Sequence, residues 1–129
     1  MKKLLFISFH RIGVLLPSAR STSSFEICVE GQVRGSGYIE HVESRLADAD
    51  IVFAYAGVNM FEDMVALAAR HPGRLRLVLC DCDQVRRRSL LTQYAIDPTT
   101  VYWTTACGGQ TKMGELFKYV IDNDKLPIP

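Results

Sequence analysis

The sequence predicts an α/β fold in which an open, mainly parallel sheet of four or five strands carries helices on both faces. Short apolar runs of the kind that form buried strands recur along the chain. Segments with apolar residues at helical spacing separate most of these runs, as crossover connections between parallel strands require. The chain has 129 residues, 48% of them hydrophobic, which suits one domain with its own core. We therefore expect a flavodoxin-like or Rossmann-like sheet.

The first half of the chain is predicted to alternate between extended and helical segments. Pro17 interrupts one segment, and Ile39, Val42 and Leu46 recur at the spacing of a helix face. The expected elements are a strand at 3–9, a short helix or loop at 12–20, a strand at 25–29, a glycine-rich turn at 31–37 and a helix at 38–46.

The second half shows the clearer strand and helix alternation. The expected elements are a strand at 51–55, a helix capped by Asn59 and stopped by His71-Pro72-Gly73, a strand at 75–79, a helix at 84–94, a strand at 101–103 and a last helix. Asp81 or Asp83 is expected to cap the helix at 84–94. The side chains expected to face the core from the helices are Met60, Met64, Leu67, Ala68, Val85, Leu90, Leu91, Met113, Leu116, Phe117, Val120 and Ile121.

Charge and composition exclude several classes of partner. The formal net charge of +1 argues against nucleic acid and against acidic lipid, and no apolar run is long enough to cross a bilayer. The triplet Arg86-Arg87-Arg88 is interpreted as the solvated face of a helix. Four irregularly spaced cysteines in a chain that can bury a core indicate reduced thiols in the cytoplasm. Residues 1–125 are expected to form one domain, and residues 126–129 the start of a linker to a missing downstream region.

Residues that follow the strands define a candidate ligand edge, because ligands of open parallel sheets bind beyond the carboxyl ends of the strands. The candidates are His10, Asn59, Asp81, Gly108 and Gly109. The paired glycines permit close backbone approach, and the free amides of the helix that follows can hold a polar group.

The sequence supports other kinds of binding or catalytic site less well. The run Ser8-Phe9-His10-Arg11-Ile12-Gly13 resembles the Asp-x-His-x-x-Gly loop of cobalamin-binding domains, whose histidine ligates cobalt, but Ser8 replaces the aspartate. Cys80-Asp81-Cys82-Asp83 lacks the spacing and the second pair of a zinc site, so no metal ligand is assigned. No arrangement of side chains predicts a nucleophile or a catalytic residue. Ser21 to Ser24 is only a hint of a flavin-phosphate loop.

The order of motifs along the chain resembles the N-terminal region of the large subunit of cobalt chelatase (CobN) and of the H subunit of magnesium chelatase. The segments that carry the resemblance are Lys3-Leu4-Leu5-Phe6-Ile7-Ser8, Ala49-Asp50-Ile51-Val52-Phe53, Met64-Val65-Ala66-Leu67-Ala68, Leu75 to Asp81, Gly108-Gly109, Leu116-Phe117-Lys118-Tyr119-Val120 and Leu126-Pro127-Ile128-Pro129. Lys112 departs from the family, which places an asparagine there.

The resemblance implies a part in the insertion of cobalt into a tetrapyrrole during cobalamin biosynthesis. ATP would be hydrolysed by separate AAA+ subunits, and the further partners would be the downstream domains of the same subunit and the tetrapyrrole substrate. The residues for metal insertion belong to the downstream part, so the chain is expected to be inactive alone and to hold no cofactor of its own. Two alternatives stay open: a small cobalamin or tetrapyrrole carrier that uses His10, and a docking domain without a ligand.

Overall fold

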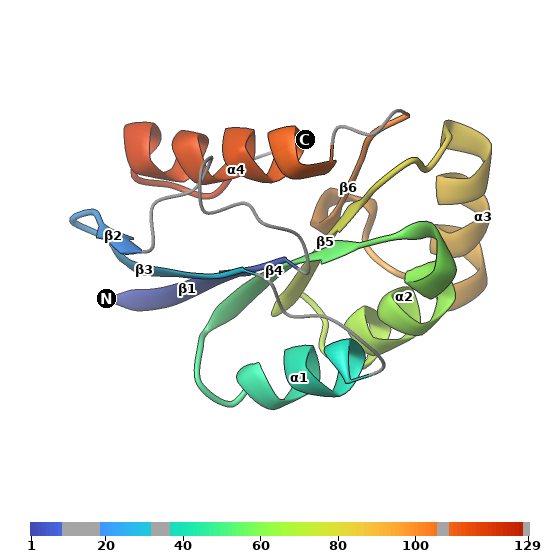
Figure 1. Ribbon diagram of the computed structural model, residues 1–129, viewed down its shortest axis with the longest axis horizontal. Helices are drawn as coiled ribbons and strands as arrows, with labels where there is room; N and C mark the ends of the chain where they lie inside the picture. Colours follow the sequence, from blue (N-terminus) through green and yellow to red (C-terminus); the bar gives the residue numbers. More distant parts are fainter. Residues whose placement is uncertain (9–18, 32–36, 106–108, 128–129) are drawn as a thin grey trace.

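The computed structural model describes residues 1–8, 19–31, 37–105 and 109–127. These residues form a sheet with the strand order β2-β3-β1-β4-β5-β6 (Figure 1). The strands are β1 (Lys2–Ile7), β2 (Ala19–Ser21), β3 (Phe25–Glu30), β4 (Ile51–Ala56), β5 (Leu75–Leu79) and β6 (Val101–Trp103). The helices are α1 (Tyr38–Arg45), α2 (Phe61–Arg70), α3 (Gln84–Tyr94) and α4 (Gly109–Asn123), with 3₁₀ turns at Val58–Met60 and Pro98–Thr100.

The sheet is open and mainly parallel, as the sequence predicts. Strands β3, β1, β4, β5 and β6 pair in parallel in that spatial order, which is the order of a flavodoxin-like sheet. Among the strands of the described segments, only β2 is antiparallel, and it pairs with β3. The order reverses between β1 and β4, which makes their carboxyl ends the topological switch point.

Strand β2 corrects the sequence prediction in two ways. The described sheet has six strands rather than four or five, and Ala19–Ser21 is extended where a short helix or loop was expected at 12–20. This segment has no apolar run of its own. Its extended form instead comes from hydrogen bonding to β3 across the short turn at 22–24.

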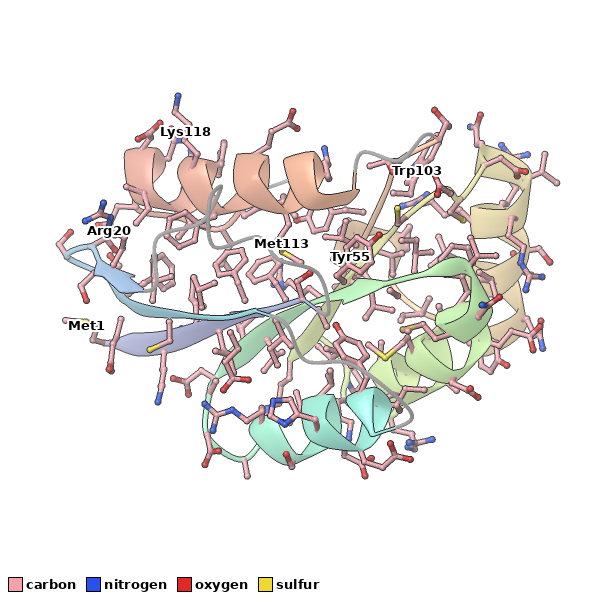
Figure 2. All side chains as sticks on the ribbon, viewed as in Figure 1. Met1, Arg20, Tyr55, Trp103, Met113 and Lys118 are labelled. Atoms are coloured by element: carbon pink, nitrogen blue, oxygen red, sulfur yellow. The ribbon has the colours of Figure 1, made fainter. Side chains whose placement is uncertain are left out.

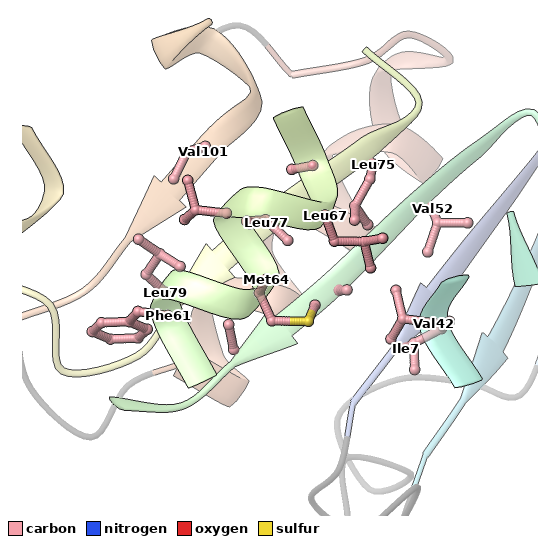
Figure 3. Packing of buried hydrophobic residues seen from close by; sticks show 14 of the residues in the cluster. Ile7, Val42, Val52, Phe61, Met64, Leu67, Leu75, Leu77, Leu79 and Val101 are labelled. Atoms are coloured by element: carbon pink, nitrogen blue, oxygen red, sulfur yellow. The ribbon is translucent and has the colours of Figure 1, made fainter. Parts of the chain in front are cut away.

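Helices cover both faces of the sheet, in unequal number. Helices α1, α2 and α3 pack on one face and α4 on the other (Figure 1). On the first face, side chains such as Met64 and Leu67 of α2 meet Val52, Leu75 and Leu77 of the strands (Figure 3). Among the described residues no helix is long and apolar enough to cross a membrane.

The α4 face is richer in aromatic side chains than the opposite face. The rings of Phe6 and Phe53 stack with centroids 4.7 Å apart, and the Phe117 ring meets Phe6 edge-on at 5.3 Å. Met113 points from α4 toward the sheet while Lys118 points away from it (Figure 2). The apolar stripe predicted for the last helix is confirmed: Met113, Leu116, Phe117 and Val120 are buried, and Ile121 is partly buried against the same core.

Helix α3 packs differently from the prediction. Leu90 and Leu91 are buried as expected, whereas Val85 is 76% exposed. The expectation that Val85 packs inward is therefore wrong. Because the helix lies beyond β5 near the β6 edge of the sheet, the sheet covers less of it than of α2 (Figure 1).

The end of α4 is fastened to the β2–β3 turn. The carboxylate of Asp124 accepts hydrogen bonds from the Ser23 hydroxyl, from the Ser24 hydroxyl at 3.0 Å and from the Ser24 amide at 3.0 Å. These donors, the Ser23 hydroxyl foremost, lower the pKa of Asp124 to about 2. The turn precedes β3, so it lies at the amino ends of the parallel strands. The Ser21 to Ser24 run therefore binds a carboxylate of this chain, at the end of the sheet opposite the predicted ligand edge.

Candidate functional site

A buried tyrosine of α1 contacts both strands that flank the switch point. Tyr38, in the first turn of α1, is 1% exposed, and its hydroxyl donates to the Tyr55 carbonyl at 2.6 Å. The same hydroxyl lies 3.5 Å from the Ile7 carbonyl, so it spans the carboxyl ends of β1 and β4. Burial, and next the nearby Tyr55, raise the pKa of Tyr38, so the phenol stays protonated.

The carboxyl end of β3 carries an ionic cluster that the sequence analysis missed. The Glu30 carboxylate contacts two side chains of α1. Its Oε2 lies 2.7 Å from His41 Nε2, and its Oε1 lies 2.7 Å from Arg45 Nε. His41 lies 11 residues after Glu30 in the chain, and Arg45 lies one helical turn beyond His41. The cluster holds α1 against the sheet beneath the switch point.

Two of the predicted site residues, His10 and Gly108, lie outside the described residues. Ser8, two residues before His10, is fully buried, and its amide donates to the Glu30 carbonyl at 3.0 Å. Gly109 begins α4, so the paired-glycine junction lies where β6 gives way to this helix.

Asn59 does not cap α2 as predicted. It lies in the 3₁₀ turn Val58–Met60 and is exposed, and the residue at the helix cap is Met60, which makes no side-chain capping bond. The turn runs directly into the α-helix, so Asn59 sits one position too early to receive the first free amides.

The segment after β5 has a structural role that the sequence largely predicts. The Asp83 carboxylate accepts from the Arg86 amide at 2.7 Å, which caps α3 as expected of Asp81 or Asp83. Asp81 is exposed and has a left-handed backbone with φ 57°. This conformation turns the chain from the strand into the helix.

The two cysteines on either side of Asp81 face opposite sides of the sheet. Cys80 packs in the α4-side core and Cys82 in the core beneath α2 and α3. Burial, and next the neighbouring Asp83, raise the pKa of the Cys82 thiol, which disfavours a reactive thiolate. Among the described residues no cluster of three or more histidine, cysteine or acidic side chains could hold a metal ion.

The described residues contain a groove along the edge strand β6. Its volume is about 430 Å³. The floor is β6, one wall is the first half of α4, and the other wall is Arg87 of α3, with Pro127 at one end. Figure 2 shows Trp103 at the end of β6, close to the beginning of α4. The groove is therefore lined by residues of β6 and of the first half of α4, the helix that Gly109 begins.

Arg87 is held rigidly in this groove. Its Nε donates to the Val101 carbonyl at 3.2 Å, and Nη2 donates to the Val101 and Pro98 carbonyls at 2.9 and 2.8 Å. Burial lowers the pKa of Arg87, a shift that Cys82 opposes, yet a guanidinium stays charged in proteins. Within the described part of the chain, no carboxylate lies within ion-pair distance of Arg87.

Tyr102 forms the centre of the groove floor. Its hydroxyl donates to the Pro127 carbonyl at 3.0 Å, so the segment after α4 returns to the edge strand. The Lys112 ammonium lies 5.9 Å from the centre of the Tyr102 ring and 4.0 Å from a Glu115 carboxylate oxygen. Lys112, the position that departs from the chelatase pattern, thus adds a second cation to the groove.

Sequence reasoning missed Arg87 as a site residue, because the whole triplet 86–88 was interpreted as solvated. Arg86 and Arg88 are indeed exposed, whereas Arg87 is half-buried against the edge strand. Helical spacing places Arg87 three and four residues before the buried Leu90 and Leu91, and this is the signal that separates it from its neighbours.

Comparison with models of known protein families and with curated proteins finds no match to this chain.

Proposed function

We propose that this chain acts as the N-terminal domain of a CobN-like chelatase subunit. In this role it contributes to docking, or to enclosing the tetrapyrrole, during ATP-dependent insertion of cobalt. It works with the downstream domains of the subunit and with AAA+ partner subunits, and it does not catalyse metal insertion alone.

The observation that carries the proposal is the order of sequence motifs, from Lys3 to the paired Gly108-Gly109 and on to Leu126-Pro127. This order follows the chelatase subunits over nearly the whole chain. Within the described residues, the matched segments at 3–8, 49–53, 64–68, 75–81 and 116–120 include residues of β1, β4, α2, β5 and α4.

The position of the groove gives further support. It lies between β6 and α4, and the sequence that leads from this strand into this helix contains the paired glycines, the best family marker. Its mixture of aromatic and cationic side chains suits contact with a ring that carries acidic substituents, and tetrapyrrole precursors of cobalamin are rings of this kind.

The test is complementation of a shortened chelatase. A cobalt chelatase large subunit that lacks its N-terminal region would be mixed with its AAA+ subunits, ATP, Co²⁺ and the tetrapyrrole. Cobalt insertion would then be followed by absorbance with and without this chain. We expect no turnover by the chain alone and a gain in rate when it is added, while an unrelated protein at equal concentration gives none.

Two outcomes contradict the proposal. Turnover by the chain without any other subunit would show an enzyme rather than a domain of one. A chain that neither raises the rate nor associates with any chelatase component would have no part in the reaction. If, in addition, cobalamin bound with a spectral change lost in His10→Ala, the carrier alternative would replace the proposal.

A further inference from the structure

We infer that the groove between β6 and α4 is a binding site for a carboxylate carried on a flat, apolar ring, with Arg87 receiving the carboxylate and Trp103 contacting the ring. The inference deepens the proposed function, because it assigns the groups of this groove that would bind the acid and the ring, and its small-acid source stands without that function. The inference rests on three observations within the groove.

The first observation is the charge of Arg87. Its guanidinium is fixed by the carbonyls of Val101 and Pro98, which accept three hydrogen bonds from Nε and Nη2. Carbonyl oxygens position the group without neutralising it, and no described carboxylate pairs with it. The Nη1 donors make no hydrogen bond to any described residue in the structure, so they can meet an anion without prior rearrangement.

The second observation is the apolar surface beside this charge. Trp103 is half-buried at the carboxyl end of β6, and Tyr102, Leu116 and Tyr119 continue the lining. Flat rings stack on or lie edge-on to such side chains, and aromatic side chains lose little conformational entropy when a ligand binds. The groove therefore places the partly buried aromatic side chains Trp103 and Tyr119 in the same lining as a fixed cation.

The third observation concerns the other charges that line the groove and its volume. Lys112 adds a second positive charge, and Glu115 provides the one acidic side chain of the lining. The groove volume of about 430 Å³ falls within the range of small-molecule sites. One or two fused rings fit inside it, whereas a whole tetrapyrrole can insert only one edge and one acidic substituent.

Two sources can supply this chemistry: a small aromatic acid, or the rim of a carboxylated tetrapyrrole. The second source rests on the proposed function, and the first does not. The experiment therefore uses one probe for each source.

The test is a binding titration of the whole chain followed by the fluorescence of Trp103, which is the single tryptophan of the sequence. The probes are 2-naphthoate, its neutral analogue naphthalene-2-carboxamide, the non-planar acid cyclohexanecarboxylate, and uroporphyrin, whose binding is also measured by equilibrium dialysis. We expect saturable binding of 2-naphthoate. The affinities of the carboxamide and of the non-planar acid should be lower by at least roughly tenfold.

Variants test the assignment of Arg87. Arg87→Gln should weaken 2-naphthoate binding by about tenfold, whereas Arg88→Gln, an exposed neighbour outside this groove, should leave it unchanged. Because Arg87 also holds the edge strand, Lys112→Gln and Glu115→Gln are measured as well. The first should weaken binding and the second should tighten it, with folding of every variant checked by thermal unfolding.

Binding of 2-naphthoate that depends on Arg87 supports the inference even where uroporphyrin does not bind, and then favours the small-acid source. Uroporphyrin binding with the same dependence favours the tetrapyrrole rim. Absence of saturable binding by both probes, or equal affinity for the carboxamide, overturns the inference. The chelatase proposal would still be judged by the complementation assay, which does not involve these variants.

Discussion

The two edges of the sheet hold opposite charges: a carboxylate at the β2 edge and a guanidinium at the β6 edge. At the β2 edge, the carboxylate of Asp124 is surrounded by hydroxyl and amide donors of the turn at 22–24. At the β6 edge, the cation of Arg87 is surrounded by backbone carbonyls and has no described carboxylate beside it. At the β2 edge the charged group is satisfied by hydrogen bonds from this chain. At the β6 edge the charge of Arg87 is not neutralised by a described carboxylate, and a groove lies beside it.

Among the described residues, the edge with the unneutralised charge is also the one that borders a groove. A flavodoxin-like sheet usually binds its ligand at the switch point. Here the underside of that point holds the buried Tyr38 hydroxyl, and the groove lies two strands away, at the β6 edge. Three substitutions test this contrast between the edges.

The largest effect is expected at the β6 edge. Arg87→Ala removes three hydrogen bonds from a charged donor and leaves the Val101 and Pro98 carbonyls without it. We expect the free energy of unfolding to fall by about 2 kcal/mol. Urea denaturation followed by circular dichroism measures this change. Arg88→Ala on the exposed side of the same helix is the control, and a loss as large in the control would contradict the role given to Arg87.

A smaller effect is expected from Tyr102→Phe. The substitution keeps the ring and removes the buried hydroxyl that donates to the Pro127 carbonyl. The free energy of unfolding should fall by about 1 kcal/mol, and amides near the end of the chain should exchange faster with deuterium. Tyr119→Phe is a control, since this residue lines the same groove but is only partly buried. Unchanged exchange in Tyr102→Phe would show that the hydroxyl does not hold the returning segment.

The smallest effect is expected at the β2 edge, and it depends on pH. Because the pKa of Asp124 is lowered to about 2 in the folded chain, its contribution to stability is present above the unfolded pKa near 4 and is lost as the pH falls toward 2. Asp124→Asn should therefore lower the melting temperature at pH 6 and flatten its decline between pH 4 and pH 2.

Asp122→Asn, an exposed change in the last turn of α4 two residues before Asp124, is the control for this pH dependence. It should keep the full decline. If Asp124→Asn declined as steeply as the unaltered chain over the same range, the β2 edge would not depend on this carboxylate.

The features predicted well from the sequence are those set by neighbours along the chain. The stripe of α4, including Met113 and Phe117, follows from helical spacing, and the Asp83 cap follows from hydrogen bonding three residues ahead. The parallel sheet follows from apolar runs separated by helices. Each of these signals is local, so one sequence suffices to read it.

The features that escaped prediction depend on distant partners. Strand β2 has no apolar pattern and exists because β3 lies beside it. The exposure of Val85 and the burial of Arg87 both follow from where α3 meets the edge of the sheet. The prediction that Asn59 caps α2 was wrong because a 3₁₀ turn precedes this helix and places its first residue at Phe61. No residue pattern in the sequence predicts that turn.

The alternation of Cys80 and Cys82 has a consequence for experiments on the folding of this chain. Both thiols are almost fully buried, one in each helical layer. Each sulfur can react with a thiol reagent only when its own layer opens. Labelling kinetics of single-cysteine variants would therefore measure the opening of the α4 layer and of the α1–α3 layer separately, and would establish whether the two halves of the domain unfold as one cooperative unit.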